Sequence, residues 1–215
     1  MTPAQDQARA RYRAAIAAHW DGQSDGAHDL GHLDRVWANA VEIAREEGGA
    51  DLEVLLPAAY FHDAVNLPKN HPDRARASVA SADWASAFLA ADGFAPAKIA
   101  AVAHAIATHS FSANITPETP EAAILQDADR LEALGAIGIA RMFHVGGAMG
   151  GLLFDAEDPL AQNRPLDDKR FSLDHLEVKL FPIAQTMRTA TGRELALARV
   201  EWMRSFRARL LREIT

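Results

Sequence analysis

The stretch at residues 54–63 has the sequence VLLPAAYFHD, an apolar run that ends in a histidine and an aspartate. We expect a buried helix here, capped by Asp51 and bent at Pro57. An imidazole and a carboxylate at the end of a buried segment suit metal ligation, because the apolar run fixes the backbone that carries them. The His62–Asp63 pair alone is weak support, since a histidine also ends many helices through an ordinary hydrogen bond. A metal site would therefore need further histidines and aspartates from other parts of the chain.

The spacing of apolar residues predicts helices along the whole chain and no convincing strand. Alanine is plentiful, whereas aromatic and β-branched residues are sparse, which favours helix over sheet. We therefore expect an all-α fold, a single domain over residues 1–215 with its core motifs at 28–135 and C-terminal helices at 172–213 packing on them. Residues 150–170 should form a long irregular stretch. The expected helices lie near 5–20, 29–47, 52–62, 73–91, 96–109, 120–134, 173–181 and 191–213, and a further helix punctuated by glycines follows the one at 120–134.

Composition excludes several classes of function. The net charge of −7 argues against nucleic acid or an anionic membrane as the main partner, because both require a basic face. The chain has no cysteine, so it has neither disulfides nor thiolate metal sites, which fits a reducing, cytoplasmic compartment. Residues 133–154 are the one candidate membrane span. Arg141, His144 and six glycines make them a poor one, and we interpret them as a buried helix and a loop.

Four of the expected helices carry a histidine or an aspartate near one end. These residues are His32 on the second, His62 and Asp63 on the third, His104 and His109 on the fifth, and Asp127 and Asp129 on the sixth. Two imidazoles and two carboxylates that converge would form a mixed nitrogen and oxygen site for a divalent ion. Water bound to such an ion is acidic enough to attack phosphorus as hydroxide.

The order of His32, His62–Asp63 and Asp129 resembles the H…HD…D signature of the HD-domain metal-dependent phosphohydrolases. The flanking segments 28–37 (HDLGHLDRVW), 126–135 (QDADRLEALG) and 177–180 (EVKL) are similar to the bacterial YedJ-type HD proteins. This resemblance implies an HD-domain-like bundle of about eight to nine helices that hydrolyses a phosphate ester or anhydride of a small molecule. Nucleotides are the commonest substrates among such relatives. It also implies one divalent cation, whose identity stays open among Mn, Mg, Co, Ni, Zn and Fe.

Carried over by position, the resemblance makes His32, His62, Asp63 and Asp129 the metal ligands. Asp63 and a metal-bound water would then be the catalytic groups. Asp127 and Asp129 point about 200° apart on a helix, so only one should reach the metal. Some relatives place an acidic residue shortly after the HD pair to position the water. Here residues 64–67 read AVNL, which leaves the general base open.

Further side chains are candidates for binding the substrate. Arg35 lies three residues after His32 on the same side of its helix, where a guanidinium could hold a phosphate; an ion pair is the alternative. The other candidates are His28, one turn before His32; Lys69 and His71, just past the HD pair; His109, at the end of its helix; and Lys179, after the long loop.

Two other functions stay open from the sequence. A di-iron oxygenase of HD fold would use two extra histidines, for which His104 and His109 supply the number but share one helix. A non-catalytic protein could keep the metal only to bind a ligand. The sequence decides neither between phosphate and pyrophosphate release nor whether the protein forms a homodimer.

Overall fold

The structure, a computed structural model, describes residues 2–21, 29–67, 73–110 and 113–214. Within these residues the fold is all-α, as expected, and its only β-type pairing is an isolated bridge between Leu152 and Phe171. No helix of the described residues has both the length and the apolar character needed to cross a membrane. The chain divides into two compact units, residues 1–129 and 130–215, which are taken in turn below. The expectation of a single domain stays a prediction.

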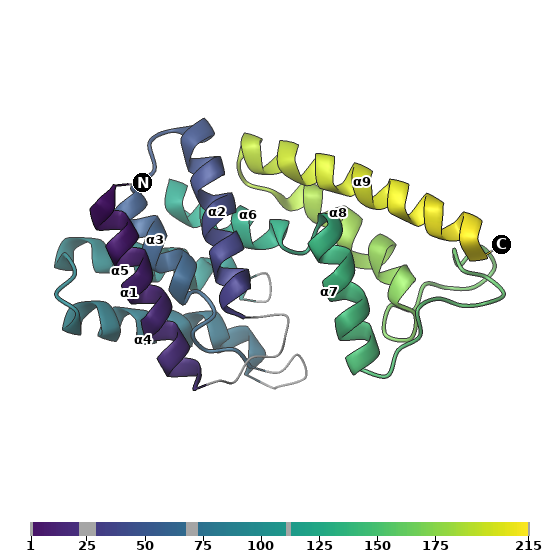
Figure 1. The fold of residues 1–215 in the computed structure, drawn as a ribbon, viewed down its shortest axis with the longest axis horizontal. Coiled ribbons are helices and arrows are strands. Elements are labelled where there is room, and N and C mark those ends of the chain that lie inside the picture. Colours follow the sequence, from purple (N-terminus) through teal and green to yellow (C-terminus); the bar gives the residue numbers. More distant parts are fainter. Residues whose placement is uncertain (1, 22–28, 68–72, 111–112, 215) are drawn as a thin grey trace. The chain divides into compact units, whose positions relative to one another are not determined.

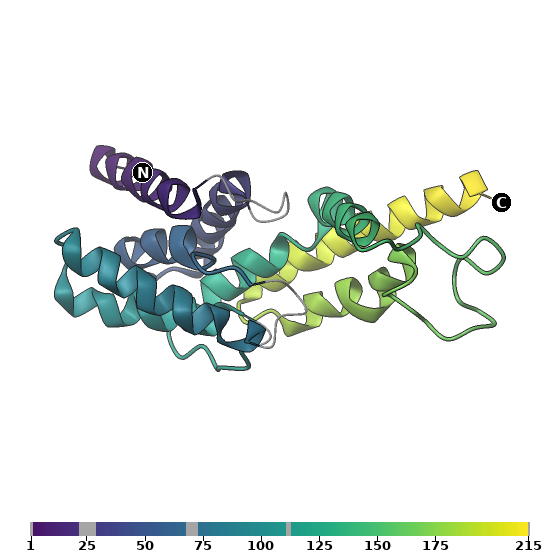
Figure 2. The same cartoon turned by 90° about the horizontal axis from the view of Figure 1, so that it is seen from below.

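The N-terminal unit is built around α3, the apolar segment of the HD pair. Every residue from Val54 to Phe61 is buried. Asp51 caps this helix by accepting the Glu53 N–H at 2.9 Å, and Pro57 lies inside it. Helices α1, α2, α4 and α5 all pack against α3, and α4 and α5 run side by side (Figures 1 and 2). The helices of this unit are α1 (Pro3–Trp20), α2 (Leu30–Glu47), α3 (Leu52–Phe61), α4 (Ala77–Ala91), α5 (Pro96–His109) and α6 (Pro120–Leu131), with a 3₁₀ turn at Arg74–Arg76.

Two side-chain amides tie α6 to its neighbours. Asn39 on α2 donates through Nδ2 to the Ala128 carbonyl at 3.2 Å. Gln126 donates through Nε2 to the Thr108 carbonyl, at the end of α5, at 2.8 Å. Both amides are buried, where a lost hydrogen bond is costly. These bonds therefore fix the turn of α6 that carries Asp129 against the middle of α2 and the end of α5.

A polar network ties α1 to α2 and α3. Asp34 accepts from Arg9 at 2.9 Å, from Arg13 at 3.0 Å and from the Tyr60 hydroxyl at 2.6 Å. Burial raises the pKa of Tyr60 to about 12, so this hydroxyl stays a donor. Burial also raises the pKa of Asp34, but the bonds from Tyr60, Arg9 and Arg13 lower it by more, and its pKa lies below the usual value. Asp34 therefore joins three helices as a carboxylate.

The C-terminal unit combines two long helices with a chain of short ones. The helices α7 (Gly135–Ala148) and α9 (Ala190–Ile214) pack together. The expected helix near 173–181 is instead broken into short turns, which include a π-helix at Leu176–Leu180. The other turns are a 3₁₀ turn at Ser172–Asp174, α8 (Phe181–Ile183) and a 3₁₀ turn at Ala184–Thr186. A Cβ on Gly138 would lie 2.3 Å from the Ala133 carbonyl oxygen, so the start of α7 requires glycine at this position.

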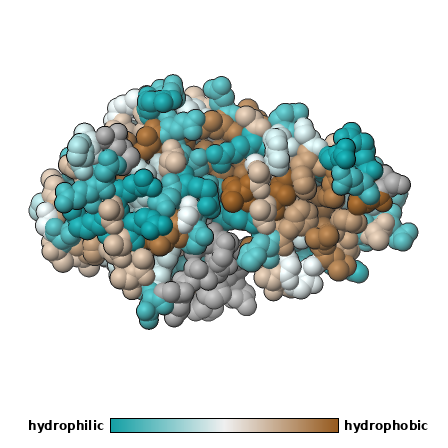
Figure 3. All heavy atoms as spheres, viewed as in Figure 1, coloured by the Kyte–Doolittle hydropathy of each residue, from teal (hydrophilic) through white to brown (hydrophobic). Residues whose placement is uncertain are grey.

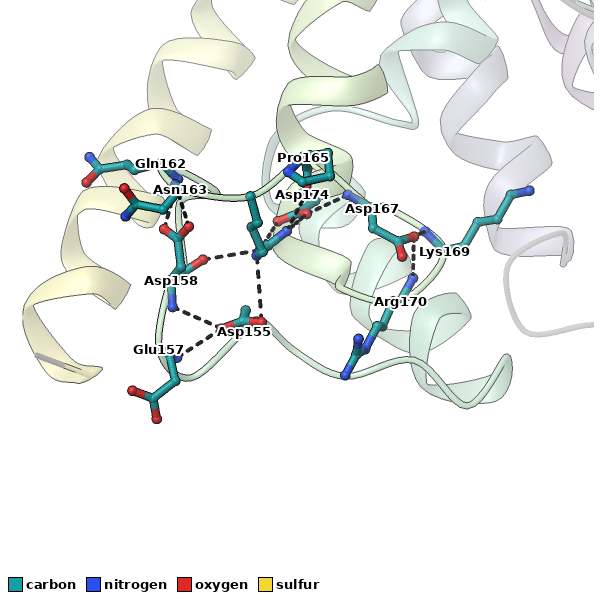
Figure 4. A network of polar contacts seen from close by, with 11 residues as sticks. Asp155, Glu157, Asp158, Gln162, Asn163, Pro165, Asp167, Lys169, Arg170 and Asp174 are labelled. Carbon is teal, nitrogen blue, oxygen red and sulfur yellow. Dashed lines mark hydrogen bonds and ion pairs between the residues drawn. The ribbon is translucent and has the colours of Figure 1, made fainter.

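The loop between α7 and the 3₁₀ turn at Ser172–Asp174 is irregular, as expected, and it is organised around Arg164. The Arg164 guanidinium donates to both oxygens of the buried Asp174, at 2.6 and 3.0 Å. Asp155 and Asp158 accept backbone N–H groups of the same loop, as Figure 4 shows. The loop carboxylates are thus engaged within the loop itself, and they hold it in one shape.

Apolar residues also lie on the surface of the C-terminal unit, as the brown areas of Figure 3 show. The exposed large ones include Met149, Leu152 and Leu153. The backbone of Leu152 pairs with Arg170 and Ser172, and the Leu153 carbonyl accepts from Leu173 N. The two ends of the loop are therefore joined through their backbones, while these leucine side chains stay exposed.

The network around Asp34 yields a prediction on stability. The substitution Asp34→Asn should lower the free energy of unfolding by about 1–2 kcal/mol at pH 7, because two arginines lose a charged acceptor. The folded-state pKa of Asp34 is depressed, so its contribution is present above the unfolded value of about 3.9 and is lost as the pH falls below it. Urea unfolding of both proteins at pH 7 and at pH 3 measures the difference, which should shrink at pH 3.

Asp92→Asn is the matched control for that substitution. Within the part of the chain that the structure describes, the Asp92 carboxylate forms one ion pair, with the exposed Arg11 at 3.0 Å. Exposed pairs contribute about 0–1 kcal/mol. An equal loss in both variants, or a difference between wild type and Asp34→Asn that does not depend on pH, would contradict the role given to Asp34.

Candidate metal centre

Four side chains from three helices of the N-terminal unit lie close together. His32 comes from the first turn of α2, His62 and Asp63 follow the last residue of α3, and Asp129 comes from α6. His32 and His62 are fully buried, while the Asp63 and Asp129 side chains keep 15% and 28% of their exposure. The cluster therefore has a buried imidazole side and an open carboxylate side.

The distances within the cluster are short and similar. The Nε2 atoms of His32 and His62 lie 3.3 Å apart. Asp63 Oδ2 lies 3.7 Å from His32 Nε2 and 3.5 Å from His62 Nε2. Asp129 Oδ1 lies 3.5 and 3.7 Å from the same two atoms. Ligands about 2.0–2.2 Å from one divalent ion are spaced in this way.

Local contacts fix the backbone of His32 and the imidazole of His62. The Asp29 carboxylate caps α2 by accepting the His32 N–H at 2.7 Å, which fixes the turn that carries His32. His62 Nδ1 lies 2.9 Å from the Ala59 carbonyl oxygen. Because a carbonyl only accepts, this nitrogen carries the proton, and Nε2 keeps its lone pair towards the cluster. A histidine held through one nitrogen in this way is the usual arrangement of a metal ligand.

The charges of the cluster also fit a cation. Burial raises the pKa of Asp63, but His62, His109 and His32 lower it by more, and its pKa lies well below the usual range. Burial likewise raises the pKa of Asp129, but His62 and the other imidazoles lower it by more, so its pKa also lies below the usual value. Both groups are therefore carboxylates at neutral pH. Two carboxylates and two imidazole nitrogens form a donor set suited to a borderline or hard divalent ion.

Of the two aspartates of α6 and the two histidines of α5, the structure brings one of each to the cluster. Asp127 is fully buried and is absent from the groups of described residues that could hold a metal, whereas Asp129 is present. His104 is turned away, because its Nε2 accepts the Glu118 N–H at 3.0 Å. His109 joins the edge of the cluster, with Nε2 3.6 Å from Asp63 Oδ1. Only one of the two additional histidines therefore reaches the site.

The remaining candidates lie in different places. Arg35 is half-buried on α2, and its Nη1 lies 3.2 Å from where a Cβ on Gly31 would stand. The bare glycine thus makes room for the guanidinium beside the turn that carries His32. Lys179 is exposed on the π-helix of the C-terminal unit. His28, Lys69 and His71 lie outside the described residues.

Comparison with known proteins identifies the family. The family model of the HD domain matches residues 29–134, which contain all four clustered side chains. The uncharacterized protein YpgQ of Bacillus subtilis is 33% identical over 191 residues, which cover 87% of this chain and 84% of YpgQ. This chain belongs to the HD-domain family.

Solved structures of the family have the same fold. The crystal structure of Bacillus subtilis YpgQ in complex with ADP matches with a TM-score of 0.74 and 31% identity, over 97% of this chain and 96% of that one. An HD-superfamily hydrolase from Bacillus thuringiensis matches with a TM-score of 0.75 and 28% identity, over 97% of both chains. The fold of this HD protein is thus that of HD-superfamily hydrolases, and it carries a cluster that could hold a metal.

Substitutions of Asp129, which belongs to the cluster, and of Asp127, which does not, should have different effects. Asp129→Asn should weaken Mn²⁺ binding by at least about 100-fold, because losing even an outer contact of a metal site costs 10- to 100-fold. Asp127→Asn should keep Mn²⁺ affinity within about tenfold and instead lower thermal stability, because it alters a fully buried group. Isothermal titration with Mn²⁺ and thermal unfolding of both variants test this. Weaker binding in Asp127→Asn than in Asp129→Asn would reverse the assignment.

Proposed function

We propose that this HD protein is a metal-dependent phosphohydrolase that acts on a small phosphorylated molecule, with a nucleotide as the expected class. The observation that carries the proposal is the cluster of His32, His62, Asp63 and Asp129. The Nε2 atoms of the two histidines lie 3.3 Å apart, and each lies 3.5–3.7 Å from one oxygen of each aspartate. A divalent ion bound there would act as a Lewis acid and lower the pKa of its water. The ADP bound to the related YpgQ supports the nucleotide class.

The side chains in and around the cluster would have different roles in the reaction. His32, His62 and Asp129 hold the ion, and Asp63 both holds it and contacts the attacking water. Arg35 binds a phosphate oxygen that the ion does not reach, which its place beside the first turn of α2 supports. His109 lines the same edge of the site, where it contacts Asp63. We also retain Lys179, His28, Lys69 and His71 as predicted contacts of the substrate.

The position after the HD pair has a consequence for the mechanism. Where some relatives place an acid, this chain has Ala64, Val65 and Asn66. None of these side chains titrates near neutral pH, so none can act as a general base there. We propose that Asp63, an ionised carboxylate that keeps 15% of its side-chain exposure, would accept the proton of the attacking water.

The test is a screen of nucleoside mono-, di- and triphosphates with Mn²⁺, Mg²⁺, Co²⁺ or Ni²⁺, in which the product is identified as phosphate or pyrophosphate. Hydrolysis should require the added ion. It should fall by about a thousandfold or more in His62→Ala, because the Lewis acid contributes several kcal/mol to the barrier. His19→Ala, which alters a histidine whose ring lies 4.3 Å from that of Trp84 in the same unit, is the matched control and should keep full activity.

Three results would contradict the proposal. Hydrolysis that is independent of the ion and unchanged in His62→Ala would come from another site or a contaminant. Consumption of O₂ by an iron-loaded, coloured protein would indicate the oxygenase alternative. Tight metal binding without turnover of any phosphate ester would indicate a protein that only binds its ligand.

A further inference from the structure

The boundary between the two units falls inside α6, directly after a residue of the metal cluster. Asp129 is the last residue of the N-terminal unit, whereas Arg130 and Leu131, which complete α6, belong to the C-terminal unit. Asp129 therefore lies in the last turn of its helix, where the backbone carbonyls have no partner within the helix. Helix ends fray unless other groups bind these carbonyls. The contacts of the last two residues therefore affect how firmly the Asp129 carboxylate is held.

An arginine of α9 binds the end of α6. Arg199 donates through Nη1 to the Leu131 carbonyl at 2.6 Å, and a positive charge is favourable at a helix C-terminus. The stem of Arg199 lies beside the turn that follows α6, since a Cβ on Gly135 would stand 3.4 Å from its Cγ and Cδ. Ala196 and Val200, which flank Arg199 on α9, are buried. The donor therefore comes from an anchored part of α9.

A second arginine ties the same turn of α6 to the C-terminal unit. Arg130 donates through Nη1 to the Thr186 carbonyl at 2.6 Å. Thr186 ends the 3₁₀ turn at 184–186, and Ala184 and Met187 on either side of it are buried. The acceptor is therefore fixed as well. Hydrogen bonds from a charged donor are stronger than neutral ones, so these two bonds oppose fraying of the helix end.

We propose that Arg199 and Arg130 are positioning residues of the metal centre, which hold the last turn of α6 and, through it, the Asp129 carboxylate. Asp129 Oδ1 lies 3.5 Å from His32 Nε2 and 3.7 Å from His62 Nε2. A binding site works only when its side chains are held within about 0.5 Å of the productive geometry. A frayed turn would therefore weaken metal binding. Two residues of the C-terminal unit thus set the metal affinity without being ligands.

The positioning role rests on the metal site of the proposed function, and it differs measurably from a role in stability alone. A residue that only stabilises the fold changes the fraction of folded protein. Well below the melting temperature this fraction stays close to one, so the apparent metal affinity does not change. A positioning residue instead changes the metal affinity of protein that is fully folded.

The experiment measures Mn²⁺ affinity by isothermal titration, well below the melting temperature, and thermal unfolding of the same proteins without metal. Arg199→Met keeps a long apolar side chain beside Gly135 but removes the guanidinium. It should weaken Mn²⁺ binding by at least about tenfold, as when an outer contact of a metal site is lost. Arg199→Lys keeps a positive charge and a donor, so it should bind Mn²⁺ more tightly than Arg199→Met.

Two further variants complete the set. Arg130→Met removes the other bond and should also weaken Mn²⁺ binding by at least about tenfold, which keeps the inference testable even where Arg199→Met is poorly folded. Arg193→Met is the matched control. Arg193 lies on α9 as well, but its Nη2 donates to the Met187 carbonyl, outside α6, at 3.2 Å. This control should keep the wild-type Mn²⁺ affinity, whatever its melting temperature.

Wild-type Mn²⁺ affinity in folded Arg199→Met and Arg130→Met would overturn the positioning role, as would an equal loss of affinity in Arg193→Met. The hydrolysis screen tests the proposed function separately. An active enzyme whose metal affinity is unchanged in both variants keeps the function and rejects the positioning role. Weakened Mn²⁺ binding in both variants, with no hydrolysis by the wild type, keeps the positioning role and rejects the function. A wild-type protein that binds no Mn²⁺ rejects both.

Discussion

The site depends on the meeting of two imidazoles and two carboxylates in a space from which water is largely excluded on one side. The Nε2 atoms of His32 and His62 lie 3.3 Å apart, and each lies 3.5–3.7 Å from an oxygen of Asp63 and of Asp129. The rest of the unit must hold these polar groups in place. The burial of α3 fixes His62 and Asp63. Asn39 and Gln126 fix α6 by buried amide bonds, which set the position of Asp129.

Much of the fold and of the candidate site could be predicted from the sequence, because the patterns that specify them lie within single helices. The limits of α5 match the expected 96–109, and α2 and α3 begin directly after the aspartates that cap them. The apolar run of α3 predicted a buried segment, and all of it is buried. The 200° separation of Asp127 and Asp129 on one helix correctly predicted that only one of them joins the cluster.

Which faces of the helices are buried, and which side chains meet between helices, depends on tertiary contacts that the spacing of apolar residues does not determine. In α4, Ala87 is exposed and the buried positions include small residues such as Ala82 and Ala85, because small side chains permit close approach to α5. In α9, the large Trp202 side chain is 46% exposed while its neighbour Met203 is buried. The contact of His109 with Asp63 arises between α5 and the end of α3, where no local pattern could have predicted it.

The central claim is that a divalent ion binds among His32, His62, Asp63 and Asp129. Anomalous diffraction from crystals soaked in Mn²⁺ tests it most directly. The account predicts a strong peak about 2.0–2.5 Å from His32 Nε2, His62 Nε2, one oxygen of Asp63 and one oxygen of Asp129. No peak at this position in crystals that bind Mn²⁺ elsewhere, or four side chains that point apart, would contradict it.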